Sequence, residues 1–425
     1  MVTYRKYVLG NGLTLVTHEA TDTPLATVNM LYNVGSRDEN PTRTGFAHLF
    51  EHLMFGGTPQ VPDFDTVVSS CGGECNAFTN TDITNYYITL PAAHLDTALQ
   101  LEADRMANLT IDAHSLDVQQ HVVTEEYHQR YTNQPYGDVW LLLRRLTYDR
   151  HPYRWATIGD DINHVAQATL DDVRAFHERF YRPQNAILAI AAPLQHEQMA
   201  KMAAEAWQCS VQPCNDCGAA GERVLALQSA SCLETQVFRY GQVMQVERDV
   251  PASRVYITLP MVDHFDPLFR ACDLLTDVLA NGQSSRLYDR LVRNRQVFTS
   301  VDASISGEAG PGMIVVGGTL AGGINHDDAL EALRHELLLL VNEPIADYEL
   351  AKVINKYENT YVYAQYKAAD RALGLCMHTW LGDTETFNTD PEQYRCVTAK
   401  QMYEAAQMLR PERGNVLIYR SAERQ

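Results

Sequence analysis

The sequence has no apolar run that approaches the roughly 20 residues of a transmembrane helix, so we expect no membrane span. Its first ten residues contain no apolar h-region, so no signal peptide is visible. A signal that had been trimmed away would leave the same beginning. These observations favour a cytoplasmic protein, with the periplasm as the alternative if a signal was removed.

Cysteine is present in a pattern that does not suit a disulfide framework. The nine cysteines form an odd set, and several lie in apolar segments, as at Cys71, Cys272 and Cys376. This distribution favours a reducing compartment. The C-x-x-C pair of Cys214 and Cys217 lacks a second pair or a nearby histidine, so we interpret it as loop thiols rather than as a second zinc site.

Positive charge is scarce in this chain. Its 34 Lys and Arg residues stand against 53 Asp and Glu residues, which gives a formal net charge of −19 at pH 7. This deficit argues against nucleic acid and anionic membranes as partners. The acidic groups could favour basic or polar peptides if they line a cavity, or they could serve solubility. The length of 425 residues predicts two domains or more.

One short segment carries a metal-binding pattern. His48 and His52 stand four residues apart with Glu51 between them, and apolar residues recur at helical spacing over 45–55. On a helix, positions i and i+4 share one face, so both imidazoles can bind one metal ion, with Glu51 nearby as a general base. The order H-x-x-E-H is the inverzincin pattern. The alternative is a set of ordinary helix residues with hydrogen-bonded histidines.

A catalytic zinc ion takes three protein ligands, so the third ligand must come from elsewhere in the chain. The pattern over 115–127 predicts an amphipathic helix that begins near Asp112 or Ser115. Its expected apolar face consists of Leu116, Val122 and Val123. The helix also carries adjacent acids, Glu125 and Glu126, which point about a hundred degrees apart, so only one can easily face the metal. The residues alone do not choose between them.

The HLFEH run at 48–52, followed by VVTEEY at 122–127, resembles the pitrilysin-type (inverzincin) zinc metallopeptidases, a family that includes insulysin and the mitochondrial processing peptidase. In that family the distal Glu follows the second His by roughly 75 residues, and Glu126 follows His52 by 74. The resemblance therefore implies that Glu126 is the third ligand of one Zn²⁺ per chain. It also implies an α+β fold of two homologous domains, each a mainly antiparallel sheet covered by helices.

Two further segments resemble the family. The VGSRDE run at 34–39 resembles the segment that leads into the metal helix, and GGECNAFT at 72–79 resembles an edge strand that binds substrate. The resemblance implies that Asn76 and Ala77 hold the peptide backbone by strand addition. Without it, Asn76 would be interpreted as a turn residue after the glycines.

The chain contains a diverged internal duplication. A helix expected over 170–181 leads into a strand over 186–190, and a helix over 399–409 leads into a strand over 416–419. Similar offsets, near 228 to 232 residues, recur in other pairs of segments, which predicts two α/β halves of about 210 residues.

This duplication suggests a division of the chain. We expect a zinc-binding peptidase domain over 1–212, a linker over 213–231 and a homologous domain over 232–425. The segment that corresponds to the metal helix, near 271–279, has no H-x-x-E-H motif, so only the first half is expected to bind the metal.

The second half departs from the family in one respect. The run GQSSRL at 282–287 matches a family run that precedes an Arg and a Tyr seven residues apart, but Val292 and Thr299 occupy those two positions, with Arg293 and Phe298 as neighbours. The missing pair would hold substrate backbone and steady the tetrahedral intermediate. The resemblance therefore implies a heterodimer in which a homologous subunit supplies the pair, or a homodimer of altered activity.

These features predict a zinc endopeptidase that hydrolyses peptides or small unfolded proteins inside a chamber. The alternative is a non-catalytic assembly subunit, like the family's core subunits in a respiratory complex. The intact zinc residues argue against that alternative, and the missing Arg and Tyr argue for it. A structural zinc site is less favoured, because such sites are usually closed by four Cys or His ligands.

Overall fold

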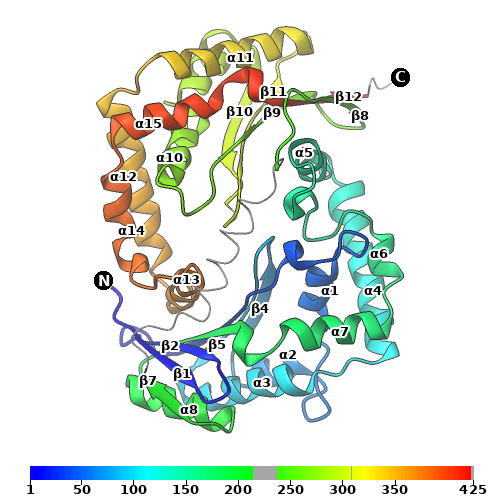
Figure 1. Cartoon of the computed structure of the whole chain (residues 1–425), viewed down its shortest axis with the longest axis vertical. Coiled ribbons are helices and arrows are strands. Elements are labelled where there is room, and N and C mark those ends of the chain that lie inside the picture. Colours follow the sequence, from blue (N-terminus) through cyan, green and yellow to red (C-terminus); the bar gives the residue numbers. More distant parts are fainter. Residues whose placement is uncertain (214–236, 308, 423–425) are drawn as a thin grey trace. The chain divides into compact units, whose positions relative to one another are not determined.

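The computed structural model describes residues 1–213, 237–307 and 309–422. These residues form two compact units that alternate along the sequence (Figure 1). The first unit consists of the described residues within Met1–Tyr127, Trp155–Ser229 and Tyr361–Asp390. The second consists of those within His128–Arg154, Ala230–Thr360 and Pro391–Gln425. Each unit combines one sheet with several helices, which confirms the expected α+β class.

The first unit is built on a seven-stranded sheet with the order β4-β5-β3-β6-β2-β1-β7. Its strands are β1 (Arg5–Leu9), β2 (Thr14–Glu19), β3 (Leu25–Tyr32), β4 (Glu74–Thr79), β5 (Thr84–Pro91), β6 (Ala186–Ala192) and β7 (Val211–Pro213). Neighbouring strands are antiparallel except β2 and β6, which are parallel. The sheet is therefore mixed, with β4 at one edge.

Helices cover both faces of this sheet. The helices of this unit are α1 (Phe46–Leu53), α2 (Phe64–Ser70), α3 (Leu95–Asn108), α4 (Ala113–Tyr127), α6 (Asn163–Ala166), α7 (Leu170–Phe180), α8 (His196–Ala206) and α13 (Ala368–Trp380), of which α4 packs on α1 and α6 rather than on the strands. Helix α13 packs on β3 and β6, and Figure 1 shows it on the opposite face from α3 and α8. This double cover explains why β6, with the sequence AILAIAA, is buried along its whole length.

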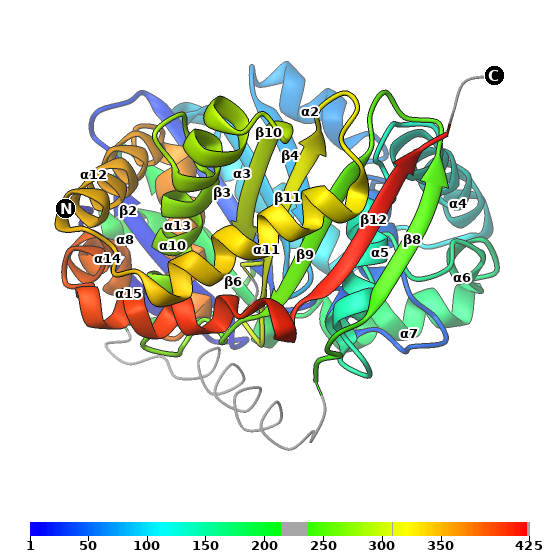
Figure 2. The same ribbon diagram turned by 90° about the horizontal axis from the view of Figure 1, so that it is seen from above.

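The second unit is built on a five-stranded sheet with the order β10-β11-β9-β12-β8. Its strands are β8 (Val243–Arg248), β9 (Arg254–Pro260), β10 (Phe298–Ile305), β11 (Met313–Leu320) and β12 (Asn415–Ser421). Its helices include α5 (Val139–Thr147), α10 (Phe269–Ala280), α11 (His326–Asn342), α12 (Asp347–Ala364) and α15 (Ala399–Ala406), and α14 (Thr386–Arg395) continues from the first unit. Figure 2 shows α10 and α11 over the strands, where they enclose the larger core of this unit.

The two sheets repeat one plan. Strands β4, β5, β3, β6 and β2 occur in the same order as β10, β11, β9, β12 and β8, and the single parallel pair falls at the same place in each. Strand β2 begins at Thr14 and β8 at Val243, and this difference of 229 residues recurs between the starts of β3 and β9, β5 and β11, and β6 and β12. The predicted offset of 228 to 232 residues is confirmed.

The units exchange one helix each. Helix α5, from the first half of the sequence, packs on β9 and β12 of the second unit, and α13, from the second half, packs on β3 and β6 of the first unit. The compact units therefore do not coincide with continuous halves of the chain. The expected linker over 213–231 lies almost entirely outside the described residues, so the division at that point stays a prediction.

Two further observations concern the cysteines and the apolar character of the helices. Six cysteines lie among the described residues, at positions 71, 75, 209, 272, 376 and 396, and all are free thiols. The C-x-x-C pair of Cys214 and Cys217 lies outside the described residues. Within the described part of the chain, none of the helices is both long and apolar enough to traverse a bilayer.

Candidate metal centre

Helix α1 carries the H-x-x-E-H motif and begins at a residue with unusual backbone geometry. Gly45 precedes it with φ of 91°, in the left-handed region that favours glycine. The helix then runs from Phe46 to Leu53 with most of its surface buried, as its apolar periodicity predicts. It ends before Gly56, so the expected glycine stop follows the helix by a short turn. The backbone thus places His48 and His52 on one face.

Helix α4 supplies the facing surface. It begins where the sequence predicts, because Asp112 Oδ1 accepts a hydrogen bond from the Ser115 amide (2.8 Å), while Ser115 Oγ accepts one from the Asp112 amide (3.0 Å). Leu116 and Val123 are buried. The expectation that Val122 joins them was wrong, since 42% of its surface is exposed. The packing of α4 against α1 gives this helix a narrower apolar face than the sequence suggests.

The two helices bring three potential ligands together. Glu126 Oε2 lies 3.1 Å from His52 Nε2 and 3.5 Å from His48 Nε2, and the three donor atoms all lie within 4.8 Å of one another. Glu125 is exposed on the same helix. The structure therefore places Glu126, and not its neighbour, beside the histidines.

The spacing of these atoms fits zinc. In a tetrahedral site with bonds near 2.05 Å, neighbouring ligand atoms lie roughly 3.3 Å apart, close to both measured distances from Glu126. His48 is buried, whereas His52 and Glu126 are half-buried, so the site has an open side. Three protein ligands and an open side are typical of a catalytic site rather than a structural one.

Glu51 lies on α1 beside two buried tyrosines. Tyr86, on β5, donates a hydrogen bond to the Phe50 carbonyl of α1 (3.2 Å), and its hydroxyl lies 3.5 Å from that of Tyr181. Burial raises the pKa of both hydroxyls well above the usual value, and the charge of Glu51 raises them further. Both phenols therefore stay protonated near neutral pH.

The segment before α1 is fixed by contacts that the sequence did not reveal. The indole Nε1 of Trp155 donates to the Ser36 carbonyl (2.8 Å), and Arg37 forms an ion pair with Asp82 (2.5 Å). Beyond them lies Glu39, which accepts hydrogen bonds from amides at the start of α1. Burial raises the pKa of the Glu39 carboxyl to about 8, even though those amides favour its charged form. The resemblance of 34–39 to the family was the only signal for these residues.

Asn76 and Ala77 lie in β4, at the open edge of the first sheet. The interpretation of Asn76 as a turn residue was therefore wrong. Asn76 is exposed, and its side-chain oxygen accepts a hydrogen bond from the Ala77 amide (2.8 Å). Helix α1 contacts this strand. A peptide that pairs with β4 would thus add to the sheet next to the metal helix.

The positions expected to carry the family's Arg and Tyr lie in the second unit. Val292 is partly buried against the core of that unit. Thr299 is exposed on β10, and its hydroxyl donates to the Thr319 carbonyl (3.3 Å). Their neighbour Arg293 pairs with Asp289 (2.9 Å). Neither Val292 nor Thr299 offers the charge or the phenol that the family pair would supply.

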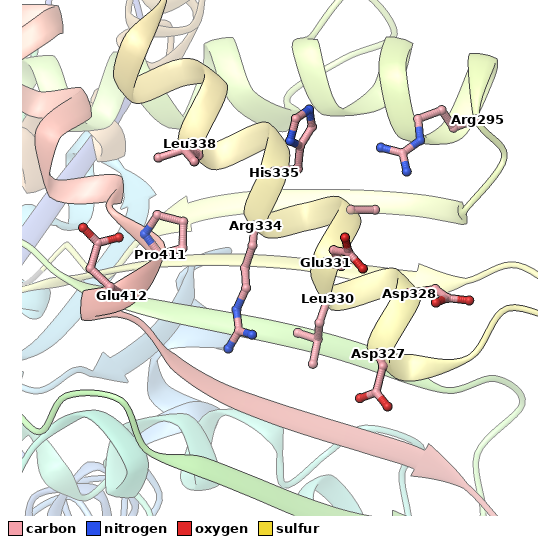
Figure 3. Close-up of a pocket in the computed structure, with 11 residues that line it drawn as sticks. Arg295, Asp327, Asp328, Leu330, Glu331, Arg334, His335, Leu338, Pro411 and Glu412 are labelled. Carbon is pink, nitrogen blue, oxygen red and sulfur yellow. The ribbon is translucent and has the colours of Figure 1, made fainter.

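A separate hollow of about 920 Å³ lies on the second unit (Figure 3). It runs beside α11, and charged side chains of both signs line it, among them Arg295, Asp327, Arg334 and Glu412. None of the predicted site residues lines it. The metal cluster, and not this hollow, therefore carries the candidate chemistry.

Comparisons with known proteins show similarity along most of the chain. Residues 14–160 match the family profile "Insulinase (Peptidase family M16)", and residues 167–357 match "Peptidase M16 inactive domain". Zinc protease PqqE of Helicobacter pylori is 35% identical over 201 residues, which cover 46% of this chain and 45% of that relative. A zinc protease of Streptomyces coelicolor, named as uncharacterised, is 26% identical over 85% of this chain and 77% of its own length.

Solved structures show the same fold. A protease from Helicobacter pylori superimposes with a TM-score of 0.85 at 22% identity, over 99% of this chain and 100% of that one. Pitrilysin superimposes with a TM-score of 0.77 at 16% identity, over 100% of this chain and 45% of its own. Both matches extend over the two units described above.

Proposed function

Because the chain belongs to the peptidase M16 (insulinase/pitrilysin) family, we propose that it is a zinc-dependent endopeptidase that hydrolyses peptides or small unfolded proteins. The observation that carries this proposal is the meeting of His48, His52 and Glu126, with Glu51 on the same helix turn. Only the first half bears these residues, in keeping with the match of the second half to the inactive-domain profile.

The proposed mechanism assigns a task to each side chain. His48, His52 and Glu126 would hold Zn²⁺, which, when bound, acidifies a water and polarises the scissile carbonyl. Glu51 takes the proton of the attacking water and returns it to the departing amine nitrogen. The phenols of Tyr86 and Tyr181, whose pKa values are raised by burial, stay protonated and do not act as bases.

We infer that the substrate binds in an extended conformation along β4. An edge strand offers unpaired backbone groups to a peptide. The Ala77 amide donates a hydrogen bond to the exposed Asn76 side chain, and a peptide carbonyl can replace that side chain as the acceptor. Recognition through the backbone suits an enzyme that acts on unfolded chains of varied sequence.

We also propose that this chain is the metal-bearing subunit of a dimer that encloses a chamber. Val292 and Thr299 stand where an Arg and a Tyr are expected, so a homologous subunit would supply that pair; a homodimer is the milder alternative. The beta subunit of the yeast mitochondrial-processing peptidase, 27% identical over 198 residues, is named as one subunit of a larger enzyme. A non-catalytic assembly subunit is the second candidate function, and the missing pair favours it.

The compartment is inferred from the cysteines and from one structural relative. Free thiols favour a reducing compartment, and we propose the cytoplasm on that ground. A structural relative at 18% identity is titled the periplasmic protease PqqL of Escherichia coli. The periplasm therefore remains the alternative.

The substitution Glu51→Gln tests the enzymatic role. It should leave about one zinc per chain, because the ligands are untouched, and should lower peptide hydrolysis at least 100-fold, because the proton acceptor is lost. Metal content is measured by mass spectrometry and hydrolysis with a quenched fluorescent peptide, in the presence of a homologous subunit where one is needed. His48→Ala is the matched control and should lose the metal as well. Hydrolysis by Glu51→Gln at the parent rate would falsify the assignment.

A further inference from the structure

Glu39 carries a buried carboxyl group behind the metal helix, and the proposed mechanism does not use it. Only 7% of its surface is exposed. Its Oε2 accepts a hydrogen bond from the Gly45 amide (2.9 Å), and its Oε1 accepts one from the Ala47 amide (2.8 Å). The Gly45 amide directly precedes α1 and the Ala47 amide lies in its first turn, where backbone N–H groups have no partner within the helix. Glu39 therefore acts as the cap of this helix.

Glu39 caps α1 from outside the helix because the N-cap residue, which usually supplies the acceptor, cannot do so here. Asp63, Thr169 and Asn325 each cap the helix that follows them with their own side chain. At the start of α1 that position is Gly45, which has no side chain and makes no cap of its own. A Cβ added there would lie 2.8 Å from the Ile158 carbonyl oxygen and 2.6 Å from a methyl of Val165. The close packing and the positive φ require glycine, and six residues earlier Glu39 supplies the missing acceptor.

The capped turn leads directly into the ligands. Ala47 is adjacent to His48, and α1 is only eight residues long. A shift of its first turn would therefore move His48 relative to Glu126, which is carried by a different helix. Zinc sites tolerate deviations of about 0.2 Å in ligand distance, so a small movement is enough to weaken binding.

Glu39 is itself held in place. It follows the short 3-10 turn Ser36–Asp38, whose Ser36 carbonyl receives the Trp155 indole and whose Arg37 pairs with the buried Asp82. The acceptor that caps α1 is thus attached to a fixed support rather than to a mobile loop. A rigid support for the shell behind the ligands is what a preorganised metal site requires.

We propose that Glu39 is a positioning residue of the metal centre, which fixes the first turn of α1 and thereby the distance from His48 to Glu126. The inference rests on the proposed function for the identity of the metal, but not for hydrolysis. Glu39 touches neither substrate nor ligand atoms in this role. It acts through the amides of Gly45 and Ala47.

The test is the zinc affinity of the full chain with Glu39→Gln, measured by competition with a chromogenic chelator. Glutamine turns a donor NH₂ toward one of the two amides, so one cap is lost while size is kept. We expect the Kd for Zn²⁺ to rise at least tenfold. The visible spectrum of the Co²⁺-substituted protein should also change, because it reports the arrangement of the ligands.

The matched control is Asn325→Ala, which removes a helix cap far along the chain on a helix without metal ligands. It should lower the melting temperature while leaving the zinc Kd and the Co²⁺ spectrum unchanged. If Glu39→Gln does not fold, Glu39→Asp keeps the carboxyl group with a shorter reach, and we expect a smaller increase in the zinc Kd.

An unchanged zinc Kd in a folded Glu39 variant would overturn the proposal, as would an equal increase in the Asn325→Ala control. Because the readout is metal binding, the result stays informative if the parent protein proves unable to hydrolyse peptides. That second outcome would count against the proposed function alone.

Discussion

A single buried ion pair in α3 shows how much one residue can contribute to this molecule. Arg105 donates to both carboxylate oxygens of Glu102 from Nε (3.0 Å) and Nη2 (2.5 Å), and neither residue is more than 1% exposed. The guanidinium also lies over the rings of Tyr86 and Phe64, with its carbon 4.5 and 4.6 Å from their centroids. Tyr86 in turn hydrogen-bonds to the metal helix, so the pair supports the wall behind the site.

Glu102→Ala should therefore be strongly destabilising. It leaves the Arg105 charge buried without its partner, and loss of one member of such a pair costs about 3–5 kcal/mol. Urea unfolding of the metal-free protein measures the change in the free energy of unfolding. The double variant Glu102→Leu with Arg105→Met is the control and should cost less than the single change, because no charge is left buried. A cost below about 1 kcal/mol for Glu102→Ala would show that Arg105 reaches water in the variant.

At the scale of elements, β4 is the strand that lies nearest to the metal helix. It is the edge strand beside α1, so its outer backbone groups are available to a partner strand. Within this strand, the Ala77 amide donates a hydrogen bond to the side chain of the exposed Asn76. The same position in the second sheet is taken by β10, which carries no ligands nearby among the residues that the structure describes.

Ala77→Pro should weaken substrate binding without removing zinc. Proline lacks the amide hydrogen and is tolerated on edge strands, so the sheet itself should survive. Loss of one backbone hydrogen bond to the peptide predicts about a tenfold fall in kcat/KM. Steady-state kinetics and metal analysis measure the two quantities. Ala77→Ser keeps the amide and should behave like the parent; a fall in zinc content in the proline variant would instead indicate a disturbed α1.

On the scale of the whole molecule, the chain repeats one plan twice, and the first copy carries the candidate metal ligands. Both sheets share strand order and a 229-residue offset, and each unit borrows a helix, α5 or α13, from the other half of the sequence. Cys376 of α13 lies buried against the carbonyls of Asn29 and Ile187, which shows how closely the borrowed helix fits. Neither half of the sequence can therefore complete its own unit.

The double substitution Val292→Arg and Thr299→Tyr tests the division of labour between subunits. If a partner normally supplies these groups, restoring them should raise the peptidase activity of the lone chain about 10- to 100-fold, through stabilisation of the transition state. Activity is measured with and without a homologous subunit, and zinc content should not change. Full activity of the unmodified chain on its own would contradict the heterodimer.

Local patterns in the sequence determined much of this protein. Helical periodicity fixed α1, α7 and α15, and the H-x-x-E-H spacing alone put two imidazoles on one helical face, because both depend on residues only a few positions apart. The duplication could also be predicted from the sequence, since corresponding helix and strand patterns recur at one offset along the chain.

Only the tertiary structure decided which residues meet. Helix periodicity does not choose between Glu125 and Glu126, and the family resemblance implies Glu126; the packing of α4 on α1 places Glu126 beside the histidines and leaves Val122 in solvent. The exchange of α5 and α13 and the capping of α1 by Glu39 join segments whose contacts no local period encodes. Periodicity predicts which face of an element is apolar. The element that packs against that face is decided only when the whole chain buries its apolar residues together.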